Sequence, residues 1–215
     1  MRSLEAELAT AHELDVSELA DAVETVGFEC TRCGACCTAD DDEPHTATVF
    51  PDEIRELQAT DDYGWRDVAR PMPYGLTEGA DGPEGETFEW ALQTDDCGDC
   101  TFYEETDGVG ACTVHEDRPL ICRTYPFSVA LGGTSQPMGE AVEREGMVRA
   151  HECEGLGRDI AREDAVEMAR ALKERAIREL EEAIAVRDSY DPVDAEGGVV
   201  VHDSEGAKRP DGTSL

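Results

Sequence analysis

The chain reads CTRCGACC at residues 30–37, and this stretch decides the fold because it holds four cysteines within eight residues. A hydrophobic core has no need of thiols at this density. Soft metal ions and iron–sulfur clusters, in contrast, require several thiolates that converge on one point. The C-x2-C spacing suits a tight turn that directs two sulfur atoms to the same side. The stretch therefore predicts a domain organised around a metal centre.

Further cysteines follow this stretch and bring the total to nine. They lie at Cys97, Cys100, Cys112, Cys122 and Cys153. An odd count fits a pure disulfide framework poorly. In a reducing cytosol, a cysteine-dense sequence binds metal or does redox chemistry more often than it forms disulfides. We therefore expect thiolate ligands rather than cystines.

Two kinds of site use a run such as CTRCGACC. A zinc knuckle uses its turn glycine to let backbone amides point at sulfur, whereas a cubane-binding loop uses C-x2-C-x2-C to reach three corners of one cluster. Cys30, Cys33 and Cys36 match the second pattern, with Cys122 as the distant fourth ligand. The spacing favours an iron–sulfur cluster of the 4Fe-4S type, which would serve an electron carrier, a sensor or a cofactor-using enzyme. Zinc is the alternative and would make a stapled structural or interaction module.

The doubled cysteine at the end of the run indicates a second site. Adjacent side chains in extended backbone point to opposite faces, so Cys36 and Cys37 are not expected to aim at the same centre. We expect Cys37 to turn toward another site built with Cys100, Cys112 or Cys153.

The order of the cysteine motifs resembles one known family. CxxCxxCC is followed by CTF at 100–102, CTVHEDRP at 112–119, CRTYP at 122–126 and CEG at 153–155. This order is similar to that of the YkgJ-type cysteine-cluster family, or CxxCxxCC proteins, described as zinc- or iron-chelating domains. The resemblance implies metal or iron–sulfur binding through Cys30, Cys33, Cys36, Cys37, Cys100, Cys112, Cys122 and Cys153. It leaves Cys97 as the odd one out, and its one enzymatic link is a relationship to flagellin lysine N-methylases.

Arginines flank one of these cysteines. Arg118 and Arg123 lie on either side of Cys122, where guanidinium groups would offset the negative charge of a thiolate-bound centre and donate to sulfur. An ordinary salt bridge to Asp117 or Glu116 explains them equally well. We keep both arginines as candidate cofactor-binding residues.

Histidines near the cysteines have an open role. His115 follows Cys112 by three residues, and His151 precedes Cys153 by two, so zinc could recruit either one. Single histidines beside a cluster are more often at the surface or behind the ligands. The family usually carries an aromatic residue at the position of His115. No Gly-rich nucleotide loop and no Ser–His–Asp set accompanies these residues, so an enzyme activity rests on analogy alone.

The remaining sequence predicts an α+β protein, a small irregular cysteine-rich domain flanked by N- and C-terminal helices. Residues 1–27 form a helical segment, 28–157 the cysteine-cluster domain, and 158–190 an amphipathic helix. Residues 191–215 turn polar and Gly-rich, which predicts a mostly disordered tail. Within the middle domain, residues 71–85 are rich in Gly and Pro and predict a loop.

Charge restricts the partners of the chain. Asp and Glu total 51 against 18 Lys and Arg, a formal net charge of −33, and the two lysines are Lys173 and Lys208. Such a surface repels nucleic acid and anionic membranes, and no apolar run or N-terminal export signal is evident. We expect a cytoplasmic protein that binds neither partner. The acids are spread through the whole chain, which favours a hydrating coat in molar salt over an acidic partner-binding face.

Halophilic adaptation predicts a salt-dependent stability. At about 1 M salt the Debye length shrinks to about 3 Å, and repulsion among the carboxylates is screened. We expect the free energy of unfolding to rise steeply between dilute buffer and molar potassium chloride, as measured by thermal or urea unfolding. Equal stability at low and high salt would exclude the adaptation.

Overall fold

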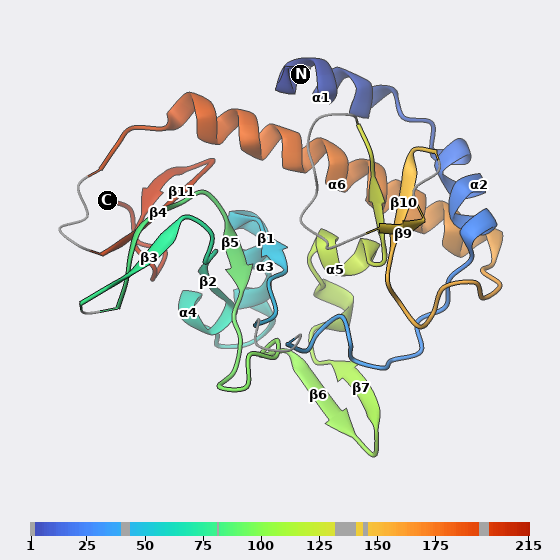
Figure 1. Cartoon of the computed structure of the whole chain (residues 1–215), viewed down its shortest axis with the longest axis horizontal. Coiled ribbons are helices and arrows are strands. Elements are labelled where there is room, and N and C mark those ends of the chain that lie inside the picture. Colours follow the sequence, from blue (N-terminus) through green and yellow to red (C-terminus); the bar gives the residue numbers. More distant parts are fainter. Residues whose placement is uncertain (1–2, 40–43, 81, 132–140, 144–145, 194–197) are drawn as a thin grey trace. The chain divides into compact units, whose positions relative to one another are not determined.

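The computed structural model describes residues 3–39, 44–80, 82–131, 141–143, 146–193 and 198–215. Helices near both ends of the chain flank a strand-rich middle, which confirms the expected α+β class (Figure 1). Within these ranges, no helix combines the length and the apolar composition that crossing a bilayer requires.

The chain forms two compact units, whereas the sequence indicated one cysteine-cluster domain. Unit 1 comprises Met1–Cys36, Thr106–Gly110 and Leu120–Glu181. Unit 2 comprises Cys37–Glu105, Ala111–Pro119 and Glu182–Leu215. The doubled cysteine of CTRCGACC is thereby divided, with Cys36 in unit 1 and Cys37 in unit 2.

Unit 1 packs helices against a small antiparallel sheet. Its helices are α1 (Leu4–Glu13), α2 (Val16–Val26), α5 (Leu120–Thr124) and the larger part of α6 (Arg162–Ser189). Its sheet has the order β8 (Phe127–Val129), β10 (Val148–His151) and β9 (Ala141–Glu143). The core lies between these elements and draws on α2, β8 and α6.

One face of α6 supplies much of this core. Apolar residues recur on α6 at the three- and four-residue spacing of an amphipathic helix, as the sequence predicted. The buried ones are Ala165, Ala169, Leu172, Ala176 and Leu180. Asp15 caps the start of α2, because its carboxylate accepts hydrogen bonds from the amides of Ser17 (2.7 Å) and Glu18 (3.1 Å).

Unit 2 contains two sheets and short helices. One sheet has the order β1 (Thr48–Val49), β5 (Trp90–Leu92) and β2 (Ala69–Pro71). The other has the order β12 (Gly206–Lys208), β11 (Val199–Asp203), β4 (Gly82–Thr87) and β3 (Leu76–Gly79). The helices are α3 (Pro51–Thr60), α4 (Trp65–Val68) and the 3₁₀ turn η1 (His115–Asp117).

A hairpin of two short strands follows Cys100 and ends at Cys112. Strands β6 (Tyr103–Thr106) and β7 (Val109–Cys112) pair with each other. The turn residues Asp107 and Gly108 both have positive φ, 54° and 77°, as a two-residue hairpin turn requires. The turn itself belongs to unit 1.

The prediction of a mostly disordered tail was wrong for residues 198–215. Strand β11 pairs in parallel with β4 and antiparallel with β12. Val200 and Val201 are completely buried, so this short apolar run contributes to the core of unit 2. A run of three valines between polar and Gly-rich flanks is too short for sequence composition to reveal.

The loop expected at residues 71–85 is also wrong, since this segment forms β3 and most of β4. Its glycines serve strand packing instead of turn formation alone. Gly75 has a φ of 91°, and a Cβ there would lie 2.8 Å from the Glu86 carbonyl oxygen. Close approach of the backbones therefore explains this glycine.

Lys208 is buried in unit 2 beside a buried carboxylate. Its Nζ donates to both oxygens of Asp203 at 2.9 and 2.7 Å and to Glu205 at 2.7 Å. Trp90 Nε1 donates to the same Asp203 carboxylate at 2.8 Å. The pair is thus fully hydrogen-bonded, which lets β11 and β12 carry charges into the interior.

Removing the lysine should show how much free energy it costs to bury the Asp203 carboxylate without a cation. We expect Lys208→Met to lower the free energy of unfolding by about 3 kcal/mol, because the Asp203 carboxylate stays buried without its cation. Arg55→Met is the matched control, since Arg55 makes a solvent-exposed pair with Glu205 (2.6 Å), and such pairs contribute roughly 0–1 kcal/mol. Chemical unfolding measures both; equal losses would show that burial of the Lys208 pair is unimportant.

Candidate metal centre

Unit 1 contains a set of cysteines that we call the first thiol group. Its members are Cys30, Cys33, Cys36, Cys122 and Cys153. The first three are exposed and lie on a segment without helix or strand. Two residues between them, Arg32 and Gly34, have left-handed backbones with φ of 59° and 81°. These bends replace the strict alternation of an extended chain, so successive cysteines are not sent to opposite sides.

A backbone clamp joins this segment to the Cys153 turn. The Glu29 amide donates to the Gly155 carbonyl oxygen at 3.1 Å, and Phe28 forms an antiparallel bridge with Leu156. A Cβ on Gly155 would lie 2.3 Å from the Glu29 carbonyl oxygen, so only glycine fits there. The clamp places Cys153 beside the start of the CTRCGACC stretch.

The electrostatics of Cys153 show which thiols surround it. Burial raises the pKa of its thiol, and the negative charges of Cys33, Cys36 and Cys30 raise it further. The Gly155 amide donates to Cys153 Sγ at 3.4 Å, and this hydrogen bond lowers the pKa of the thiol. Four thiols from two distant segments therefore interact within unit 1.

Tyr125 lies beside the same thiols. Burial, followed by the charges of Cys153, Cys36 and Cys33, raises the pKa of its phenol to about 12. Its hydroxyl donates to the Glu152 carbonyl oxygen. The phenol of Tyr125 therefore remains neutral at physiological pH.

Cys122 lies half-buried on α5 of the same unit. A buried arginine of α6 holds this short helix in place. Arg175 donates from Nη1 to Thr124 Oγ1 at 2.9 Å and from Nε to Glu179 at 2.7 Å, and its side chain is 1 % exposed. Thr124 in turn donates to the Leu120 carbonyl oxygen at 2.7 Å. The position of Cys122 thus depends on a buried polar network.

Unit 2 contains the other cysteines, which we call the second thiol group. Its members are Cys37, Cys97, Cys100 and Cys112. The Cys100 amide donates to the Cys37 carbonyl oxygen at 2.8 Å, so these two cysteines lie on directly paired backbones. Cys153, which the sequence offered as another partner for Cys37, lies instead in unit 1.

The Cys97–Cys100 turn is organised by an aspartate that the sequence analysis missed. Asp95 Oδ1 accepts from the amides of Cys97 (2.8 Å) and Asp99 (3.0 Å), and Gly98 has a φ of 87°. The run DDCGDC carries this signal, because an aspartate two residues before an amide commonly caps such a turn.

His45 is a second residue that sequence reasoning passed over. Its amide donates to the Gly98 carbonyl oxygen at 2.8 Å. Burial, followed by the positive charge of Arg70 and opposed by the charge of Asp99, lowers the pKa of its imidazole to about 4. Arg70 itself donates to the His45 carbonyl oxygen at 2.7 Å. A neutral imidazole and a guanidinium therefore adjoin the turn.

The other residues named from the sequence have these positions. Arg118 donates from Nε to the His115 carbonyl oxygen at 2.9 Å in unit 2, and Arg123 is exposed on α5 in unit 1. His115 is exposed and lies 3.1 Å from Glu116. His151 is buried, with Nε2 at 2.9 Å from Ser128 Oγ across β8 and β10. The last contact ties His151 to the sheet of unit 1.

All nine cysteines lie in the described part of the chain, where they are thiols and not cystines. Among residues 3–39, 44–80, 82–131, 141–143, 146–193 and 198–215, no three Cys, His, Asp or Glu side chains are placed to hold a metal ion as they stand. The donor set nevertheless fits soft metals, because it consists of thiolates gathered within each unit.

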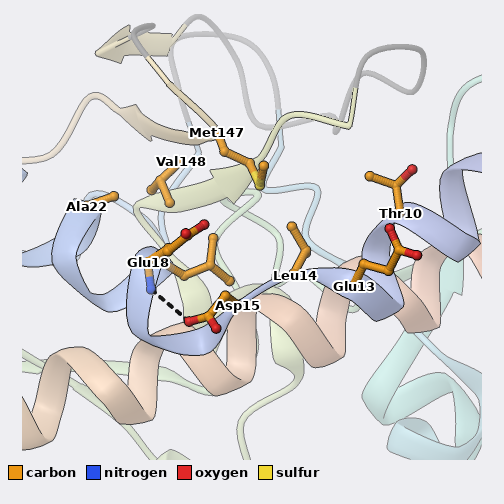
Figure 2. Close-up of a pocket in the computed structure, with 9 residues that line it drawn as sticks. Thr10, Glu13, Leu14, Asp15, Glu18, Ala22, Met147 and Val148 are labelled. Atoms are coloured by element: carbon orange, nitrogen blue, oxygen red, sulfur yellow. Dashed lines mark hydrogen bonds between the residues drawn. The ribbon is translucent and has the colours of Figure 1, made fainter.

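A hollow in unit 1 carries no such chemistry. It encloses about 340 Å³ beside α1, α2 and β10 (Figure 2). Its lining contains no cysteine, and its carboxylates include Asp15, which caps α2 through the bond to Glu18 drawn in the figure. The candidate site is therefore built from the thiol groups.

Thiolates presented by turns and short helices define a metal-chelating protein of α+β class. The chain belongs to the CxxCxxCC family, whose description is "Putative zinc- or iron-chelating domain" and whose model matches residues 29–154. The matched segment begins one residue before Cys30 and ends one residue after Cys153, so it contains every cysteine. Neither a curated protein nor a solved structure matches the chain.

The clamp predicts different effects for two nearby glycines. We expect Gly155→Ala to lower the free energy of unfolding by about 3 kcal/mol, because its methyl group would collide with the Glu29 backbone. It should also reduce the metal content after reconstitution. Gly157→Ala is the control, since nothing lies within 4 Å of its Cβ and only its left-handed backbone costs about 1–2 kcal/mol. Equal metal content in the two variants would contradict the role of the clamp.

Proposed function

We propose that the protein binds an iron–sulfur cluster of the 4Fe-4S type through its first thiol group and serves a redox or cofactor role in the cytoplasm. The observation that carries the proposal is the backbone clamp between Glu29 and Gly155, which brings the Cys153 turn beside the segment that holds Cys30, Cys33 and Cys36. Three cysteines at C-x2-C-x2-C spacing and one from a distant segment are the ligand pattern of a cubane. When bound, such a cluster supplies one-electron transfer or an iron atom open to a ligand.

We assign the fourth corner to Cys153. The clamp between Glu29 and Gly155 holds its turn against the CTRCGACC stretch, and its thiol already experiences the charges of the other three. Cys122, the distant ligand indicated by the sequence, stays in the proposal as the fifth thiol of the group. Because a cubane has four corners, loss of Cys122 should be tolerated better than loss of Cys153.

Neighbouring groups of this chain are suited to tune the bound cluster. The Gly155 amide donates to the Cys153 sulfur, and hydrogen bonds of this kind alter a cluster's reduction potential. Arg123 in unit 1 offsets negative charge at the first thiol group, and Arg118 does so in unit 2 for Cys112.

Anaerobic purification tests the proposal directly. We expect a brown protein with iron and acid-labile sulfide in near-equal amounts and a broad visible absorption that bleaches on reduction. The measurements are elemental analysis, sulfide assay and absorption spectra. A colourless protein that holds zinc in the first thiol group would overturn it and favour a structural or interaction module.

Cysteine variants test the ligand assignment. We expect Cys153→Ser to remove most of the iron and sulfide, and Cys122→Ser to remove less. Cys97→Ser, in unit 2, is the control and should leave both contents unchanged. Retention of the full cluster by Cys153→Ser would refute Cys153 as the fourth ligand.

A further inference from the structure

We propose that a cluster of aromatic rings and a carboxylate on unit 2 recognises an arginine side chain of a basic segment in a partner protein. We call this cluster the aromatic patch, and its members are Glu86, Phe88, Tyr190 and His202. The aromatic patch contains no cysteine, so it is independent of the iron–sulfur proposal.

A buried histidine supports the two other rings of the aromatic patch. His202, on β11, is 2 % exposed. Its imidazole stacks on the ring of Phe88, with centroids 5.5 Å apart and planes inclined by 23°, and meets the ring of Tyr190 edge-on at 4.8 Å. The centroids of Phe88 and Tyr190 are 5.7 Å apart. Residues from β11, the end of β4 and the end of α6 thus form one packed group.

This packing leaves two aromatic side chains at the surface. Phe88 is 47 % exposed and Tyr190 is 40 % exposed. Among the described residues, Tyr74 is the other exposed aromatic side chain, so most rings of the chain are at least partly covered. Single exposed apolar residues need no explanation, but adjacent rings present π faces that attract a cation. Because His202 covers one face of Phe88, the opposite face is the one that a cation can reach.

A carboxylate is held in place beside these rings. The Tyr190 hydroxyl donates to Glu86 Oε2 at 3.1 Å, and His202 Nε2 lies 3.0 Å from Glu86 Oε1. Each carboxylate oxygen has a further lone pair, and the Glu86 side chain is 35 % exposed, so it can still accept hydrogen bonds from a ligand. Its orientation is already fixed, which lowers the entropic cost of binding.

The charges around the aromatic patch favour a cationic ligand. Desolvation and the hydrogen bond to Glu86, followed by the charges of Glu86 and Asp191, raise the pKa of Tyr190, so its phenol stays neutral beside two carboxylates. Glu89 is exposed next to Phe88. Arg187, in the last turn of α6, already donates to Asp188 at 2.8 Å.

The shape of the aromatic patch favours arginine over lysine. A guanidinium is planar, so it can stack on an aromatic ring and donate to a carboxylate at the same time, whereas an ammonium is a compact, strongly hydrated charge. A second copy of this chain is a poor occupant, because it would bring the same carboxylates and a net charge of −33 to the contact.

Titration of the full chain with the peptide Gly-Arg-Gly-Arg-Gly tests the proposal. In about 1 M potassium chloride, diffuse attraction to the acidic surface is screened. We expect saturable shifts of the Phe88 and Tyr190 ring signals in nuclear magnetic resonance spectra. A peptide with citrulline in place of arginine, which keeps the planar shape without the charge, should cause none.

Variants locate the binding site. Phe88→Ala and Glu86→Gln should each weaken the affinity for the arginine peptide about 10-fold, in line with the strength of cation–π contacts. Tyr103→Ala is the matched control and should bind as the unaltered chain does. The Tyr103 hydroxyl also donates to a glutamate, Glu105, at 3.1 Å, but its ring contacts no other ring in the described part of the chain.

Several results would overturn the assignment. They are equal shifts with the citrulline peptide, equal affinity for a peptide with lysine in place of arginine, or unchanged affinity in Phe88→Ala. Concentration-dependent dimerisation that Phe88→Ala abolishes would assign the aromatic patch to a second copy of the chain and overturn it as well. Iron and sulfide contents should be the same in all these variants, so failure here is distinguishable from failure of the iron–sulfur proposal.

Discussion

The close approach of two backbone segments, at Glu29 and Gly155, is the contact on which the first thiol group depends. Cys30 and Cys153 are far apart in sequence, and the Glu29–Gly155 hydrogen bond at 3.1 Å sets their segments side by side. The approach leaves no room for a Cβ, so glycine at position 155 is required for the two segments to meet in this way.

Negative charge opposes the gathering of thiols within each unit. The cysteines belong to a chain whose formal net charge is −33, and burial, followed by the charges of neighbouring thiols, raises the pKa of Cys153. Neither lysine relieves it: Lys208 serves the buried Asp203, and Lys173 donates to the Leu14 carbonyl oxygen at 2.7 Å.

Sequence periodicity and density revealed the parts of the structure that depend on local pattern. The buried face of α6 follows from the spacing of its apolar residues, and the cysteine density of CTRCGACC indicated the metal-binding family. Long-range pairing was not accessible. Strand β11 forms through parallel pairing with β4, which is distant in sequence. The charged residues Asp203 and Lys208 have the composition of a surface segment, although the structure buries them. The partner of Cys37 and the neighbours of Cys153 likewise depend on which unit each turn joins, and cysteine spacing does not encode that.

The boundary between the two units falls between the two adjacent cysteines, Cys36 and Cys37. A single peptide bond separates Cys36, coupled electrostatically to Cys153 and Tyr125, from Cys37, whose carbonyl oxygen accepts from the Cys100 amide. The two adjacent thiols therefore belong to different units, although only one peptide bond separates them.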